Sequence, residues 1–161
     1  MSNGGDEEPF DAFFREERGR LVSQAYLLTG DLHSAQDLAQ ATLERAWRHW
    51  SEVSSYERPA AWARRVVFNL AVNQHKRLSR EEPLGRHDQV DRAHEDHLAL
   101  VEALRTLPST QQQALVLHDG VGLSVAEVAC ELHAPAGTVK AWLGRGRARA
   151  QELTTKEPET R

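Results

Sequence analysis

The sequence predicts an all-α fold of two small helical domains joined by an acidic, flexible linker. Apolar residues recur at helical spacing on both sides of residues 81–97, an acidic stretch that contains Pro83 and Gly85 and has no sustained apolar period. The alternating apolar pattern of a half-buried strand is missing from the sequence. We therefore expect one domain at residues 10–80 and a second at residues 98–153.

The first domain is expected to contain three long helices. The first runs from Phe10 to Leu28 and stops at Gly30, and Asp31 then caps a second helix that ends near Trp50. Residues 51–59 have no helical period, so they are expected to form a loop before the third helix. The second helix has an apolar face, expected to be buried, at Ala39, Leu43, Ala46, Trp47 and Trp50. Its available polar face consists of Asp37, Gln40, Glu44 and Arg48.

The charges are segregated along the chain, although the net charge is only −4. Acidic residues crowd the N-terminus and the linker, whereas two stretches, residues 58–80 and 132–151, contain no acid and several cations. Two separate basic surfaces are therefore expected, and basic surfaces of this kind suit a nucleic-acid partner.

The first basic stretch lies on the third helix. One narrow stripe of that helix contains Trp62, Arg65, Asn69, Asn73, Lys76 and Arg80, and the opposite side contains Ala63, Val67, Leu70, Ala71 and Leu78. Rings and guanidinium planes stack on bases while cations meet phosphates, so the stripe suits a nucleic-acid backbone with unstacked bases. Tyr56 in the preceding loop would add to it. The residues alone leave open a solvated basic face with Trp62 in the core.

The second domain begins with an apolar series from Leu98 to Leu107, breaks at Pro108 and continues into a pair of short-linked helices. Ser124 and Glu127 form a capping box that predicts a helix start. This helix is expected to end near Leu132, before a tight turn at His133 and Ala134. Pro135 suits the first position of the next helix, where its missing N–H is not needed.

That last helix has the properties of a DNA recognition helix. Its buried face is predicted at Val139, Leu143, Gly146 and Ala150. Trp142 projects beside the edge of this face, where core packing is favoured over stacking on a base. Its opposite crest consists of the small residues Gly137, Ala141, Gly144 and Ala148, flanked by Thr138, Lys140, Arg145 and Arg147. The backbone could therefore lie deep in a major groove, with cations reaching phosphates and guanine edges. The alternative is a helical hairpin with a solvated basic face.

Other functions find little support in the sequence. Phosphate loops, nucleophile elbows and HExxH patterns are missing, so enzyme activity is not indicated. The spacing of Cys130 and His133, like that of His94 and His97, suggests half a metal site without a second ligand pair, and neither metal nor cofactor is expected. The acidic N-terminus does not resemble a secretory signal, and apolar runs of membrane-spanning length are missing, so a cytoplasmic protein without membrane insertion is expected.

The order of these parts resembles the extracytoplasmic-function (group IV) sigma factors of the sigma-70 family, and the SigE-like family of actinobacteria in particular. GDLHSAQDLAQATLERAWRHW resembles the region that binds polymerase, and RPAAWARRVVFNLAVNQHKR resembles the region that melts and reads the −10 element. LPSTQQQALVLHDGVGLSVAEVACELHAPAGTVKAWLGRGRARA is similar to the C-terminal helix-turn-helix that reads the −35 element. The combination of the three segments covers most of the chain.

The resemblance implies that core RNA polymerase, through its β′ clamp helices and β flap, and promoter DNA are the partners. It implies that the polar face of the second helix, Asp37, Gln40, Glu44 and Arg48, meets polymerase. The loop residues Ser54, Ser55, Tyr56 and Arg58 would capture an unpaired promoter base, and Trp62, Arg65 and Asn69 would hold the melted junction. Relatives are commonly inhibited by an anti-sigma factor, so such a partner is a further expectation.

The sequence departs from the family pattern at three positions of the −35 domain. Gln112 and His118 stand where many relatives carry arginine, and Trp142 stands where arginine or lysine is common. These departures leave the strength and sequence of −35 recognition open, with weak promoters or help from an activator as the alternatives. A rival hypothesis is a helix-turn-helix regulator that binds duplex DNA directly and uses its first domain for sensing or dimerisation. A third, an all-helical adaptor for protein partners, leaves both basic stretches without a role.

Overall fold

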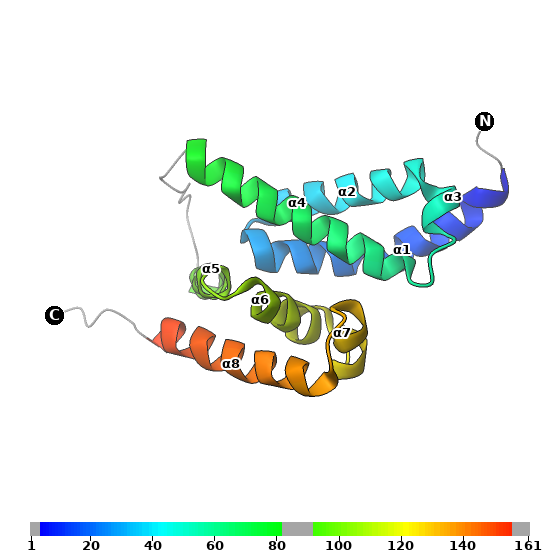
Figure 1. Ribbon diagram of the computed structural model, residues 1–161. Helices are drawn as coiled ribbons and strands as arrows, with labels where there is room; N and C mark the ends of the chain where they lie inside the picture. Colours follow the sequence, from blue (N-terminus) through cyan, green and yellow to red (C-terminus); the bar gives the residue numbers. More distant parts are fainter. Residues whose placement is uncertain (1–3, 82–91, 156–161) are drawn as a thin grey trace. The chain divides into compact units, whose positions relative to one another are not determined.

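The computed structural model describes residues 4–81 and 92–155, and these residues contain helices and turns without a strand (Figure 1). The chain divides into two compact units, Met1–Gly85 and Arg86–Arg161. The predicted all-α architecture of two helical units is therefore confirmed.

The first unit contains α1 (Gly4–Thr29), α2 (Leu32–Arg48), α3 (Trp50–Val53) and α4 (Pro59–Glu81). α1 begins earlier than predicted, because Asp6 and Glu7 in its first turn complement the helix dipole. Gly30, with a φ of 74°, ends it as predicted. Asp31 caps α2 as predicted, since its carboxylate Oδ1 accepts a hydrogen bond from His33 N at 3.1 Å.

The core of the first unit is formed where α1 packs against α2 and α4. Its buried apolar members come from all four helices: Phe13, Leu21, Ala25, Ala35, Ala39, Leu43, Ala46, Trp50, Val53, Ala63 and Val67. An ion pair lies within this packing, with Glu17 Oε2 3.6 Å from Arg64 Nη1 and side-chain exposures of only 5% and 8%. Gln24 Nε2 donates to the Arg64 carbonyl at 3.1 Å, which ties α1 to the backbone of α4.

Three details of the first unit differ from the sequence predictions. The loop predicted at residues 51–59 is shorter, because α3 occupies its first part. Leu78, predicted on the packed side of the third helix, is 48% exposed, since α4 continues past Ala71, its last buried apolar residue. The linker predicted at residues 81–97 overlaps two helices, since Glu81 ends α4 and Arg92 begins α5. Residues 82–91 of that prediction lie outside the described residues.

The second unit contains α5 (Arg92–Arg105), α6 (Ser109–Leu115), the π-helix η1 (Val116–Val121), α7 (Val125–Glu131) and α8 (Ala136–Thr155). The predicted break at Pro108 separates α5 from α6. α8 packs against α5, α6 and α7, and it buries Val139, Leu143, Gly146 and Ala150 as predicted. The π-helical turn was not predicted from the sequence.

The helix-turn-helix has the predicted capping and turn. In the capping box, Glu127 N donates to Ser124 Oγ and Ser124 N donates to Glu127 Oε1, both at 3.1 Å. His133 turns the chain with a φ of 52°. Pro135 stands one residue before its predicted position, because α8 begins at Ala136 and the Pro135 carbonyl accepts the first helical bond from Val139 N at 3.1 Å.

Candidate polymerase and nucleic-acid interfaces

The polar face of α2 is exposed along its length. Asp37, Gln40, Glu44 and Arg48 all reach solvent, as predicted. Gln40 Nε2 donates to Glu44 Oε1 at 3.4 Å, and Asp37 Oδ2 lies 3.5 Å from His33 Nε2. These contacts along one helix align the side chains for a partner.

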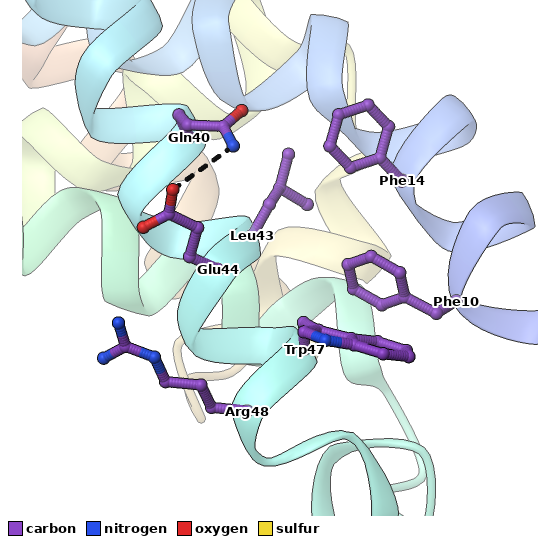
Figure 2. Close-up of a pocket in the computed structure, with 7 residues that line it drawn as sticks. All are labelled: Phe10, Phe14, Gln40, Leu43, Glu44, Trp47 and Arg48. Atoms are coloured by element: carbon purple, nitrogen blue, oxygen red, sulfur yellow. Dashed lines mark hydrogen bonds between the residues drawn. The ribbon is translucent and has the colours of Figure 1, made fainter. Parts of the chain in front are cut away.

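A hollow of about 260 Å³ adjoins this polar face and was not predicted (Figure 2). Its walls come from α1 and α2: Phe10, Phe14, Gln40, Leu43, Glu44, Trp47 and Arg48. Trp47 was predicted to be buried, but it is 38% exposed because its ring borders the hollow. Phe10 contacts this ring at a centroid distance of 4.9 Å. The spacing of Phe10 and Phe14, one helical turn apart, was the sequence signal for a shared aromatic face.

The basic stripe of α4 is mostly exposed. Arg65, Asn69, Asn73, Lys76 and Arg80 reach solvent, as the stripe predicts. Trp62 is half-buried and packs against the core of the first unit, so only part of its ring is available. The stripe therefore presents amides and cations, with Trp62 at its edge.

The turn between α3 and α4 places Ser54, Ser55, Tyr56 and Arg58 next to the start of this stripe, and all four are exposed. The Tyr56 hydroxyl donates to Glu52 Oε1 at 2.9 Å, and this hydrogen bond raises the pKa of the hydroxyl. Ser55 Oγ donates to the Glu52 carbonyl at 2.6 Å. These bonds to α3 hold the turn in one conformation beside α4.

The crest of α8 is open as predicted. Gly137, Ala141, Gly144 and Ala148 are exposed, Lys140 and Arg145 reach solvent beside them, and Thr138 and Trp142 are half-buried. A Cβ built on Gly144 would meet nothing within 4 Å, whereas one on Gly146 would stand 2.7 Å from Leu115 Cδ1. α8 therefore approaches α6 closely at Gly146, where a side chain larger than hydrogen has no room.

Arg147 was predicted to be a cation free to bind DNA, but the structure pairs it with Asp119. Its Nε donates to Asp119 Oδ2 at 2.9 Å and its Nη2 donates to Asp119 Oδ1 at 2.6 Å. This bidentate bond lowers the pKa of the Asp119 carboxyl. Two of the departures from the family pattern, Gln112 and His118, precede Asp119 in the chain. Gln112 is buried, and His118 Nδ1 is 2.6 Å from the Leu123 carbonyl oxygen.

Metal sites and membrane spans do not occur within the described ranges. Three or more His, Cys, Asp or Glu side chains do not come together there as a metal site would require. Among the helices of residues 4–81 and 92–155, none is both long and apolar enough to cross a membrane.

Comparison with known proteins matches both units. Residues 13–81 match the family Sigma-70 region 2, and residues 97–149 match Sigma-70, region 4. The RNA polymerase sigma-E factor of Streptomyces coelicolor is 30% identical over 154 residues, which cover 92% of this chain and 87% of that protein. The ECF RNA polymerase sigma factor SigL of Mycobacterium tuberculosis is 30% identical over 157 residues, covering 91% and 88%.

Two solved structures share the fold. The sigma factor RpoE of Bartonella quintana, in complex with the anti-sigma factor NepR, has a TM-score of 0.65 and 24% identity over 93% of this chain and 99% of that chain. CnrH, in complex with the cytosolic domain of CnrY, has a TM-score of 0.64 and 22% identity over 92% and 89%.

These regions and this fold define a sigma-70 type transcription initiation factor. Within that class, the chain belongs to the extracytoplasmic-function RNA polymerase sigma factors. It binds core RNA polymerase and directs promoter recognition at initiation, and sigma factors themselves are non-catalytic.

Proposed function

We propose that the two units divide promoter recognition between residues 10–80, which bind polymerase and melt the −10 element, and residues 98–153, which read the −35 element. The observation that carries this proposal is the open crest of small residues on α8, which lies opposite a buried face and beside Lys140 and Arg145. A helix of this kind lets its backbone approach bases closely while cations meet phosphates.

Polymerase binding is assigned to α2. The exposed face of Asp37, Gln40, Glu44 and Arg48 offers mixed charge and amides to the β′ clamp helices, and the aromatic hollow beside it adds apolar surface. Such a polar surface next to aromatic side chains suits a specific protein interface. The β flap is the proposed polymerase contact of the second unit, as the family resemblance implies.

Promoter melting is assigned to α4 and the turn before it. Ser54, Ser55, Tyr56 and Arg58 form the proposed capture site for an unpaired base, next to the stripe that runs from Trp62 to Arg80. Exposed amides and guanidinium groups bind phosphates and unpaired bases. Duplex DNA also exposes its phosphates, but its bases are paired and stacked, so the stripe suits melted DNA. Trp62 contributes through the exposed part of its ring.

The two DNA sites are proposed to be weak separately. Polymerase fixes their spacing, so that the second site engages at a high effective concentration once the first is bound. We therefore expect the free protein to bind promoter duplex poorly. We place it in the cytoplasm with polymerase, acting without chemistry of its own, and propose a protein partner of the anti-sigma kind, such as the anti-sigma factor NepR in the complex with RpoE.

The test is run-off transcription with sigma-free core polymerase on fragmented genomic DNA, with sequencing of the 5′ ends. The proposal expects new start sites with a shared pair of spaced upstream motifs. Asp37→Asn/Glu44→Gln should abolish these starts, whereas Glu16→Gln/Glu95→Gln, which also removes two exposed carboxylates, should leave them. Starts that persist in the first variant would contradict the assignment of polymerase binding to α2. The absence of new starts, with core that responds to a control sigma factor, would instead support a regulator that binds duplex directly or a factor that needs an activator.

The two DNA sites are separated by a second pair of variants. Arg65→Gln/Asn69→Ala should leave closed promoter binding intact but reduce permanganate-reactive unpaired thymines. Lys140→Gln/Arg145→Gln should weaken closed binding itself, because cations of α8 are proposed to meet duplex phosphates. Equal effects of both variants on both readouts would contradict the division of labour.

A further inference from the structure

Asp119 and Arg147 join two elements that are distant in sequence. Asp119 lies on η1 and Arg147 on α8, and the carboxylate accepts two bonds from the guanidinium, at 2.9 and 2.6 Å. The side chains are 45% and 52% exposed, so another anion can reach the pair from solvent. Two of the five guanidinium N–H groups are used, in the same bidentate geometry that a phosphate would take.

The pair stands at the edge of the proposed DNA surface. Arg147 follows Lys140 by seven residues, which places both cations on the same side of the α8 crest, beside Gly144. Residues 132–151 contain no acid, so Asp119 brings a carboxylate from another element to an edge that is otherwise basic. A duplex backbone lying along the crest would pass this edge.

The backbone holds Asp119 in position from both sides. It lies in the π-helical turn Val116–Val121, and Gly122, with a φ of 91°, ends that turn. Leu123 N donates to the Leu117 carbonyl at 3.0 Å, and His118 Nδ1 is 2.6 Å from the Leu123 carbonyl oxygen. Isolated π-helical turns are frequent at functional sites, where they redirect a side chain.

We propose that Asp119 is an internal competitor for DNA phosphate, which holds Arg147 in the free protein and yields it to a backbone phosphate when duplex binds. This inference rests on the proposed function of α8 as a duplex-binding helix. Arg147 can then offer its Nε and Nη2 pair of donors to a phosphate only after the bonds of these two atoms to Asp119 are broken. The exchange keeps the affinity of α8 for random duplex low, so that tight binding requires both promoter elements and polymerase.

The test titrates the full-length protein onto a short, fluorescently labelled DNA duplex of mixed sequence and follows anisotropy. Asp119→Asn should bind more tightly than the unmodified protein, because Arg147 then binds a phosphate without losing a carboxylate. Because Arg147 binds a phosphate in both complexes, the dependence of log K on log salt should be the same for the two proteins, and the advantage of Asp119→Asn should persist between about 50 and 200 mM salt.

Two comparisons make the result specific to Arg147. Asp119→Asn/Arg147→Gln should lose the tighter binding, and its dependence of log K on log salt should be shallower by about 0.9, because one phosphate fewer is bound. Glu102→Gln removes a carboxylate from another ion pair of the same unit, with Arg105 at 3.1 Å, and should change neither. Asp119→Ser, with a smaller side chain, provides a second test if asparagine disturbs η1, and thermal melting verifies that every variant is folded.

Unchanged or weaker binding by the folded Asp119 variants would overturn the proposal. Tighter binding that survives in the double variant would also overturn it, because the increase would then come from general loss of negative charge. The run-off experiment tests the proposed function separately. If the unmodified protein gives no new start sites with core polymerase, the proposed function is contradicted. Normal start sites together with an inert Asp119→Asn contradict this inference alone.

Discussion

Gly146 of α8 lies against Leu115 of α6 so closely that a Cβ on Gly146 would stand 2.7 Å from Leu115 Cδ1 and 3.2 Å from its Cγ. Leu115 is itself buried, so its side chain has little room to move. Gly146→Ala should therefore destabilise the protein by up to about 2 kcal/mol, an overpacking penalty of about 1–3 kcal/mol partly offset by helix propensity. Urea unfolding measures this change.

Gly144→Ala provides the matched control two residues earlier on the same helix. Its Cβ would meet nothing within 4 Å, so the variant should be stabilised by about 1 kcal/mol of helix propensity. If the crest of α8 approaches the bases closely, this more stable variant should also lose promoter affinity in the holoenzyme. A loss of stability in Gly144→Ala, or an increase in Gly146→Ala, would contradict the observed packing of α8.

The buried pair of Glu17 and Arg64 leads to a second prediction. Arg64→Met should lower the free energy of unfolding by about 3 kcal/mol, at the low end of the range for breaking a buried pair, because the buried Glu17 carboxylate then keeps only the mostly exposed Arg20 at 3.6 Å. Arg65→Met, at the next and exposed position, should change stability by less than about 0.5 kcal/mol. The same Arg65 variant should impair open-complex formation, so the two neighbouring arginines separate folding from function.

Helical period predicted much of this fold, because it decides which side of a helix faces inward. The four buried positions of α8 and the exposed residues of α2 and α4 follow directly from it. Local rules also predicted the Asp31 cap, the Gly30 stop and the capping box of Ser124, since each depends on residues within one turn.

Contacts between distant parts of the chain were beyond local rules. The bond of Asp119 to Arg147 crosses 28 positions, so the sequence predicted a free cation. Glu17 lies in an acid-rich segment that looks solvated, and only the packing of α1 on α4 buries it. Trp47 has the period of a core residue, but its ring contacts Phe10 and borders the hollow between α1 and α2, so it is 38% exposed. Contacts with polymerase and DNA stay predictions.

His133 forms the turn of the helix-turn-helix with a φ of 52°, a conformation that non-glycine residues adopt at a cost of about 1–2 kcal/mol. Its side chain is exposed. His133→Gly should therefore stabilise the protein by roughly 1 kcal/mol or less, since the greater chain entropy of glycine offsets part of the relief. Ala126→Gly, within α7 and exposed, should instead destabilise it by about 1 kcal/mol. Thermal melting of both variants distinguishes backbone strain from helix propensity.

Asp119 should make the stability of the second unit depend on pH in acid. The hydrogen bond from Arg147 lowers the pKa of its carboxyl below the ordinary value of 3.8, so the folded state favours the ionised form. The stabilisation is therefore complete above the unfolded pKa and is lost as pH falls through the lower folded pKa. Because the pair is about half exposed, the contribution should stay below about 1 kcal/mol. Urea unfolding from neutral pH to below pH 3.8 should show a smaller loss in Asp119→Asn than in the unmodified protein. Equal losses would mean that the ion pair does not contribute to folding, which would leave it free to act only in DNA binding.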